Sequence, residues 1–160
     1  MNLVEQFNPL LKVDMELNNS LQIVMSLKKD RALSLSLDNN LLTESSGTDY
    51  SIGLGYRIKD LKFTNRVNGK TRVSKGDLNI KTDLNFRDNI TIIRNLNILD
   101  NKVTAGQNMW SLKTSADYNL SKSFNAIFFY DHLFSKFAIS TAFPMTTIRA
   151  GMTLRYSFGE

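Results

Sequence analysis

The chain has 160 residues, 42% of them hydrophobic, a formal net charge of +5, two prolines and no cysteine. The apolar content excludes a disordered chain, and the lack of cysteine excludes disulfide frameworks, thiolate metal sites and cysteine nucleophiles. Acidic residues are interspersed among the basic ones and no block of five like charges occurs, so the sequence predicts no nucleic-acid partner.

Apolar and polar residues alternate with a period of two along nearly the whole chain, which is typical of β-strands with one apolar face. In chain order, the segments with this pattern are 11–17, 21–27, 31–38, 50–58, a weaker one from 61, 78–86, 90–96, 110–120, 124–131 and 150–158. No convincing helical period appears. The pattern predicts an all-β, antiparallel, up-and-down architecture of about ten strands in a single unit, residues 1–160.

The predicted connections alternate between short and long. Short ones are expected at 28–30, 59–60, 87–89 and 121–122, and long ones at 39–49, 67–77, 97–108 and 132–146. Outer-membrane barrels have short periplasmic turns and longer outer loops. The rhythm therefore favours a transmembrane β-barrel over a soluble sheet.

Aromatic residues of the apolar positions are expected to form two girdles around an aliphatic waist, as in lipid-exposed barrels. With the C-terminus placed in the periplasm, the periplasmic girdle is predicted to contain Tyr56, Phe86, Tyr118, Phe124, Tyr156 and Phe158. The outer girdle is predicted to contain Tyr50, Trp110 and Tyr130. This distribution predicts a bacterial outer-membrane location, with lipid around the apolar face.

The alternate positions are polar and are expected to line a water-filled lumen. The charged residues predicted there are Arg57, Lys81, Asp83, Lys113, Asp117, Arg149 and Arg155. Mixed charge stays hydrated and suits a conduit through which folded proteins slide without sticking.

The last predicted strand, "AGMTLRYSFGE", has one apolar and one polar face. Within it and just before it, Arg149, Gly151, Leu154 and Tyr156 have the polar-x-Gly-x-x-apolar-x-aromatic spacing of the signal for the barrel-assembly machinery. The long segment before this strand is unusually apolar for a surface loop. We expect its Phe134, Phe137 and Phe143 to pack against a partner or a neighbouring loop.

Several stretches also resemble the C-terminal end of the SprA (Sov) family, the gliding-motility and cell-surface translocons of type IX secretion in Bacteroidetes. They are "VEQFNPL", "KKDRALSLSLDNNLLTE", "GYRIKD", "FRDNITIIRNL" and "FFYDHLFSKFAISTAFP", and the resemblance holds in order along essentially all of the chain. The resemblance implies that the chain is the last part of the wall of a much larger barrel, which exports folded proteins.

The resemblance further implies four kinds of partner: the remainder of the SprA-like barrel, a PorV-like barrel subunit, a periplasmic plug protein and the secreted cargo. The sequence as given shows no export signal after Met1. About ten strands also enclose too narrow a pore for a folded protein. Both features predict a segment of a longer protein.

Enzyme motifs are missing: no Gly-x-Ser-x-Gly elbow occurs, and the lone His132 is expected in a solvated loop beside Asp131. Asp38, Glu44 and Asp49 do not have the spacing of a calcium-binding EF-hand loop, so they are expected to be solvated. We expect no enzyme, no cofactor and no metal site. The alternatives left open are a stand-alone small porin-like barrel and a soluble lipocalin-like barrel that binds an apolar ligand.

Overall fold

The computed structural model describes residues 1–17, 20–67, 70–121, 124–139 and 143–157, apart from the side chains of residues 63, 65–67, 70–72, 74 and 121. These residues form seven β-strands and no helix. The strands are β1 (Asn2–Leu17), β2 (Leu21–Ser36), β3 (Leu41–Val67), β4 (Lys70–Asn95), β5 (Asp100–Ser121), β6 (Phe124–Phe137) and β7 (Met145–Tyr156). In the described part of the chain, no helix is long and apolar enough to cross a membrane.

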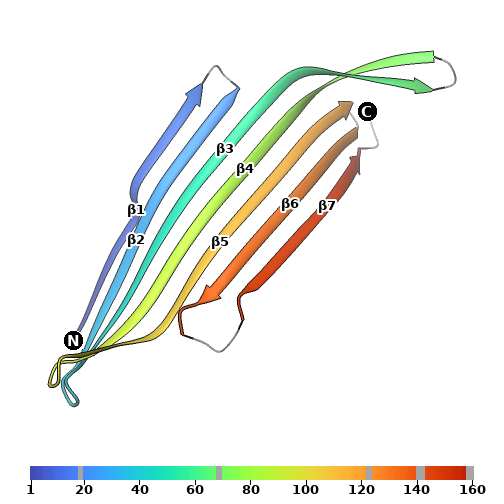
Figure 1. Cartoon of the computed structure of the whole chain (residues 1–160). Coiled ribbons are helices and arrows are strands. Elements are labelled where there is room, and N and C mark those ends of the chain that lie inside the picture. Colours follow the sequence, from blue (N-terminus) through green and yellow to red (C-terminus); the bar gives the residue numbers. More distant parts are fainter. Residues whose placement is uncertain (18–19, 68–69, 122–123, 140–142, 158–160) are drawn as a thin grey trace.

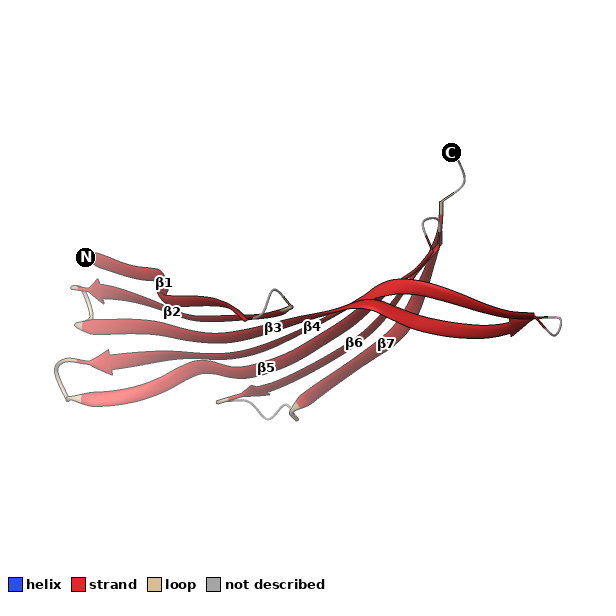
Figure 2. Ribbon diagram, turned by 90° about the horizontal axis from the view of Figure 1, so that it is seen from above, coloured by secondary structure: helices blue, strands red, loops and turns tan. Residues whose placement is uncertain are grey.

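The seven strands form one antiparallel sheet in the order of the chain, β1-β2-β3-β4-β5-β6-β7. Each strand pairs only with its sequence neighbours, and the sheet does not close (Figure 1). β1 and β7 are its two edges. Seen from above, the sheet is a single curved layer from which one hairpin projects (Figure 2). The prediction of an all-β, antiparallel, up-and-down architecture is confirmed.

The predicted number of strands, about ten, is wrong because several short predicted strands are parts of longer ones. Residues 28–30 and 87–89, expected as turns, lie inside β2 and β4. Their polar side chains do not end a strand, since the backbone of each segment pairs with a neighbour. Lys28 and Arg87, for example, both pair with Asp49 of β3.

The predicted rhythm of short and long loops is also wrong. The polar stretches expected as long loops belong mostly to strands: β3 begins at Leu41 and β5 begins at Asp100. The connection between β2 and β3 is therefore the tight turn 37–40, and the connection between β4 and β5 is the tight turn 96–99. The last expected loop is shortened in the same way, because β6 continues to Phe137. Loop length therefore gives no argument about which end of the sheet is outside a cell.

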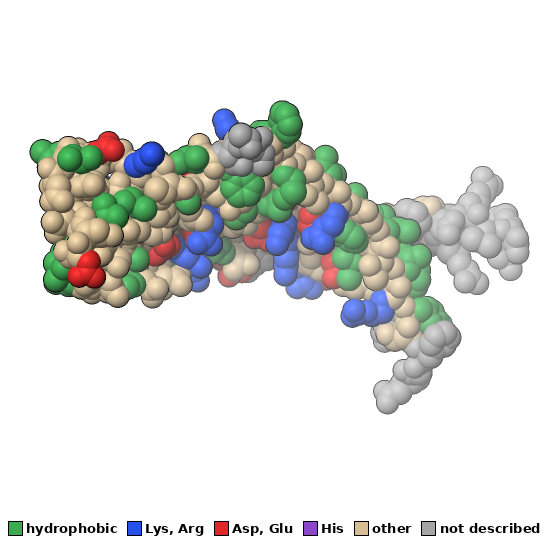
Figure 3. Space-filling model, turned by 90° about the horizontal axis from the view of Figure 1, so that it is seen from below, with side chains coloured by type: hydrophobic (Ala, Val, Ile, Leu, Met, Phe, Trp, Pro, Cys, Tyr) green, Lys and Arg blue, Asp and Glu red, His purple; other side chains and the backbone are tan. Residues whose placement is uncertain are grey.

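The sheet has almost no core. Among the hydrophobic side chains described, only Ala126 is buried, at 4% exposure, and large apolar side chains are exposed on every strand. In the space-filling view of Figure 3, basic and acidic side chains are interspersed across the middle of the visible surface, and hydrophobic side chains are exposed above and beside them. A single layer has two open faces, and the distribution of residues between these faces defines the candidate site.

Candidate functional site

One face of the sheet carries a continuous band of apolar side chains, here called the apolar band. The strand register brings alternate residues of neighbouring strands side by side: Leu27, Tyr50 and Phe86 are partners across β2, β3 and β4. The band consists of Leu11, Val13, Met15, Leu17, Leu21, Ile23, Met25, Leu27, Tyr50, Ile52, Leu54, Tyr56, Ile58, Leu78, Ile80, Thr82, Leu84, Phe86, Trp110, Leu112, Thr114, Ala116, Tyr118, Phe124, Ala126, Phe128, Tyr130, His132, Phe134, Ile148, Ala150, Met152, Leu154 and Tyr156.

The apolar band is about nine residues long in the central strands. In the central strands it runs from Tyr50 to Ile58, from Leu78 to Phe86 and from Trp110 to Tyr118, nine residues each. At ~3.4 Å per residue this is about 27 Å along the strand. A transmembrane β-strand tilted by about 45° needs about 9–11 residues. Thr82 and Thr114, the polar exceptions in the middle, have their hydroxyls 3.3 Å apart and part-buried.

Aromatic rings lie at both margins of the band. One margin is the row Tyr50, Phe86, Trp110 and Phe134, with ring centroids 6.3 Å apart for Tyr50 and Phe86 and 6.0 Å apart for Trp110 and Phe134. The opposite margin contains Tyr56, Tyr118, Phe124 and Tyr156. Phe124 and Tyr156 are direct partners, 6.3 Å apart.

The margins differ from the predicted girdles at two residues. Phe86 was expected beside Tyr56, but it lies in the opposite row with Tyr50 and Trp110, because β4 passes through the expected turn at 87–89. Tyr130 was expected at the outer margin and lies in the middle of the band, between Thr114 and Ala150. The predicted girdle residue Phe158 falls outside the described residues.

The three phenylalanines expected to pack against a partner have different surroundings. Phe134 lies within β6 and stacks on Trp110 as part of the aromatic margin, so it is not in a loop. Phe137 ends β6 and is 43% exposed, and Phe143, between β6 and β7, is 90% exposed. Packing against a partner stays a prediction for Phe137 and Phe143.

His132 is a strand residue, contrary to the expectation of a loop. It lies in the apolar band, with its ring centroid 4.6 Å from that of Trp110. Asp131 is the next residue along an extended strand and therefore lies on the opposite face, where it binds Arg149. His132 and Asp131 therefore lie on opposite faces of the sheet.

The predicted lumen residues all lie on the face opposite the apolar band, here called the polar face. Four strands contribute a row of alternating charge, in which Asp83 pairs with Lys113, Lys113 with Asp131, and Asp131 with Arg149. Arg149 Nη2 donates to Asp131 Oδ2 at 2.8 Å. Asp131 was not among the predicted lumen residues, although the period of two places it on the polar face. Opposite charges on neighbouring strands stabilise this register.

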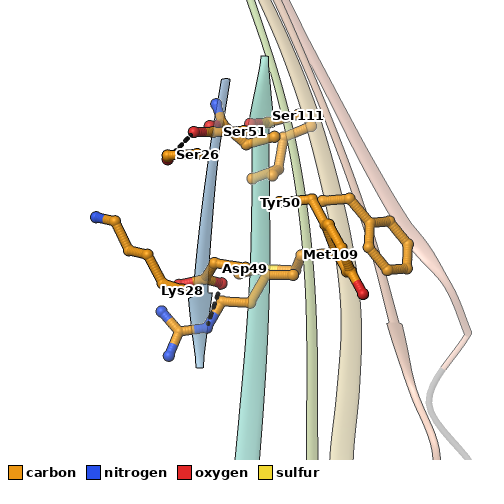
Figure 4. Close-up of a pocket in the computed structure, with 11 residues that line it drawn as sticks. Ser26, Lys28, Asp49, Tyr50, Ser51, Met109 and Ser111 are labelled. Atoms are coloured by element: carbon orange, nitrogen blue, oxygen red, sulfur yellow. Dashed lines mark hydrogen bonds and ion pairs between the residues drawn. The ribbon is translucent and has the colours of Figure 1, made fainter. Parts of the chain in front are cut away.

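A shallow depression of the polar face lies next to this row, toward the Tyr50 margin (Figure 4). There the hydroxyls of Ser26 and Ser51 are 2.6 Å apart, and Arg87 Nε lies 3.4 Å from Asp49 Oδ1. Lys28 lines the same depression. Met109 and Leu133 line it as well, so the depression has polar, charged and apolar side chains.

The residues of the predicted assembly signal lie on β7, an edge strand whose residues are all exposed. Leu154 and Tyr156 belong to the apolar band, and Arg149 and Gly151 to the polar face. A methyl group added at Gly151 would lie 2.7 Å from the ring of Phe129, its partner on β6. A glycine at this position therefore leaves room for an aromatic ring to cover the edge strand.

Three charged residues join three strands beyond the Tyr50 margin. Glu44 of β3 accepts hydrogen bonds from Arg31 Nε of β2 at 2.8 Å and from Arg94 Nη2 of β4 at 2.5 Å. The Glu44 side chain is 14% exposed. The hydrogen bond from Arg94, with a further one from Arg31, holds the pKa of Glu44 below its usual value, although partial burial opposes this shift. With both arginines on it, Glu44 acts as a structural clamp between β2, β3 and β4, and it lies within a strand and not in the expected solvated loop.

This clamp gives a prediction for pH. Because the pKa of Glu44 is lowered in the folded state, its contribution to stability is complete above the ordinary carboxyl pKa of about 4.5 and is lost as pH falls through the lowered value. Glu44→Gln should cost about 1 kcal/mol at pH 7, the upper range for partly exposed pairs. Urea unfolding at pH 7 and pH 3 checks this: the difference in the free energy of unfolding between the parent protein and Glu44→Gln should be smaller at pH 3. A difference that is equal at both pH values would contradict the prediction.

Comparison with protein families and with curated proteins gives no match to this chain.

Proposed function

We propose that this chain is a wall segment of a transmembrane β-barrel in a bacterial outer membrane, and that the barrel is a protein-conducting channel of the SprA-like, type IX class. The observation that carries the proposal is the uncovered apolar band, about nine residues high and edged by aromatic rows, which crosses all seven strands. Amphipathic rings prefer the boundary between lipid and water, and aliphatic side chains prefer the hydrocarbon between these boundaries.

Water is an unfavourable solvent for this face. Monomeric soluble proteins rarely expose contiguous apolar patches larger than a few hundred Å², whereas here large hydrophobic residues are exposed on every strand. A soluble lipocalin-like barrel would direct these side chains into an enclosed interior, but this sheet is open and encloses none. Lipid hydrocarbon would cover the band without a second protein layer.

The two edges of the sheet support a larger barrel. Within a bilayer, every backbone N–H and C=O must find a partner in the protein, and among the described residues β1 and β7 each pair with one strand only. Six chain reversals separate these two strands, so they run in the same direction. Closing this sheet on itself would require a parallel pair. An all-antiparallel barrel instead requires an odd number of additional strands, which the remainder of a SprA-like barrel would supply.

The polar face supports a water-filled conduit. Its row of alternating charge from Asp83 to Arg149 is partly neutralised within the wall itself, since Asp131 binds Arg149. The charged side chains favour hydration of this face, although the exposed Phe129, the partner of Gly151, lies on it too. The PorV-like subunit, the plug protein and the secreted cargo belong to the proposal through the resemblance of the sequence to the SprA family.

The membrane location can be tested with single cysteines, because the chain contains none of its own. On β4, Leu84→Cys places a thiol in the apolar band and Asn85→Cys places one on the polar face. On β5, Leu112→Cys and Ser111→Cys form the corresponding pair. In outer membranes, a bimane label at Leu84 and Leu112 should be quenched by brominated lipid, and labels at Asn85 and Ser111 should not. Equal quenching at both members of each pair would overturn the membrane proposal.

The channel function needs a separate test. In a strain whose type IX channel gene contains this segment, removal of β5 to β7 should abolish the appearance of folded cargo at the cell surface. Replacement of the conduit's acidic side chains by Asp83→Asn and Asp131→Asn should leave the barrel in the membrane. Surface cargo that persists without β5 to β7 would contradict the channel function and leave the membrane location intact.

A further inference from the structure

One hairpin extends far beyond the rest of the sheet. β3 and β4 have 27 and 26 residues and are the longest strands of the fold. The pairing of β4 with β5 ends at Leu78 and Tyr118, whereas the pairing of β3 with β4 continues from Leu61 and Gly76 to Val67 and Lys70. This two-stranded part, residues 61–67 and 70–76, is here called the arm, and Figure 1 shows it projecting past the end of the sheet at which β7 ends.

The arm carries the entire net charge of the chain. It has five basic residues and no acidic one. They are Lys62, Arg66, Lys70, Arg72 and Lys75. Outside the arm, the remaining 15 basic residues balance the 15 acidic ones. The basic residues are not consecutive, so no charge block appears in the sequence, and the hairpin register is what gathers them.

The base of the arm is held in a defined geometry. A β-bulge lies between Ile58 and Leu61, where Asp60 has a positive φ of 55°. The backbone N–H of Asp60 donates to Asp77 Oδ1 at 3.2 Å, and Arg57 binds the other oxygen of the same carboxylate. Bulges bend a strand and increase its twist, so these contacts fix the direction in which the arm leaves the sheet.

Two contacts from β5 support the same base. The hydroxyl of Tyr118 donates to the backbone oxygen of Leu61 at 3.3 Å. Gly76 allows the backbone of Asn119 to approach so closely that a methyl group there would lie 1.8 Å from the Asn119 oxygen. These contacts of β5 support the base of the arm where it leaves the sheet.

The charges of the arm repel one another. Lys62 and Lys75 are direct cross-strand partners, and like charges in that relation destabilise a hairpin. A two-stranded ribbon is by itself only marginally stable in water, and the arm contains no carboxylate to offset the repulsion. An anionic partner would stabilise the ribbon and would be bound in return.

We propose that the arm is a docking element for an acidic protein surface at the end of the sheet where β7 ends. Successive pairs of a hairpin alternate between its faces, so the register assigns the positions of Lys62, Lys75 and Arg66 to one face and those of Arg72 and Lys70 to the other. A flat bilayer surface would meet one face only, whereas an acidic protein groove meets both. From Leu61 to Val67 the arm also reaches about 20 Å, at ~3.3 Å per residue, which is beyond the headgroup layer next to the Tyr118 margin.

The test uses the full chain in detergent micelles, with fluorescein-labelled poly-L-glutamate as the probe and fluorescence anisotropy as the readout. The arm variant is Lys62→Gln/Arg72→Gln/Lys75→Gln. The matched control, Lys28→Gln/Lys29→Gln/Lys102→Gln, removes the same charge from exposed positions elsewhere. We expect the arm variant to bind at least tenfold more weakly, the control to change less than threefold, and binding of the parent chain to weaken as salt rises.

The charge-reversed variant Lys62→Glu/Arg72→Glu/Lys75→Glu distinguishes loss of charge from misfolding. It should lose binding to poly-L-glutamate and gain binding to poly-L-lysine, which a misfolded arm would not do. Equal losses in the arm variant and its control would overturn the proposal. Arm-dependent binding to vesicles with 30% phosphatidylglycerol, without binding to poly-L-glutamate, would also overturn it and assign the arm to lipid. None of these readouts depends on the channel function.

Discussion

Leu84→Arg should strongly reduce the amount of folded protein in the outer membrane, whereas Asn85→Arg should leave it nearly unchanged. The two residues are neighbours on β4, and the register places Leu84 in the apolar band and Asn85 on the polar face. Leu84 is one row from the middle of the band, between Ile52 and Leu112. An arginine facing lipid near the bilayer midplane costs about 2–4 kcal/mol. An arginine facing a water-filled lumen keeps its hydration.

The measurement is the heat-modifiable, protease-resistant fraction of the barrel in purified outer membranes, with both variants expressed in the same parent protein. Each variant adds one positive charge at neighbouring positions, so differences in expression or net charge do not separate them. If Asn85→Arg were as damaging as Leu84→Arg, the polar face would not be hydrated. If both were tolerated, the apolar band would not be in contact with lipid.

Gly76→Ala should destabilise the protein by about 1–3 kcal/mol, the usual cost of overpacking, whereas Gly55→Ala should be neutral or stabilising by up to about 1 kcal/mol. Both glycines belong to the β3–β4 pair. A methyl group at Gly76 would overlap the backbone oxygen of Asn119, a group that moves only if β5 moves. At Gly55 the nearest atom is 3.6 Å away, on the side chain of Gln22, which is an ordinary contact.

The opposite signs make this pair informative, because a glycine-to-alanine change reduces the entropy of the unfolded chain equally at both positions. Urea unfolding in detergent, followed by tryptophan fluorescence, gives both free energies. The chain has one tryptophan, Trp110 of β5, the strand against which Gly76 packs. Gly76→Ala should also weaken the binding of poly-L-glutamate, because the base of the arm must shift. Equal effects at the two glycines would show that β5 does not support the arm.

The alternation of apolar and polar residues is enough to predict which side chains share a face of the sheet. The period of two is a local property of an extended backbone, and the seven charged residues predicted for the polar face, from Arg57 to Arg155, all lie there. The all-β, antiparallel architecture follows from the same pattern. Most aromatic residues predicted for the margins also belong to the apolar band, because that assignment needs only their parity along the strand.

The tertiary structure decided where strands end and what lies beside them. A strand continues for as long as its backbone finds a partner, so polar segments such as 28–30 and 87–89 stay in the sheet when a neighbouring strand pairs with them. Because of this lateral pairing the chain has seven strands and not about ten, and Phe86 lies at the opposite margin from the predicted one. For the same reason His132 lies in a strand, and the basic residues of the arm lie close together. Such contacts join residues far apart in the chain, and no local period encodes them.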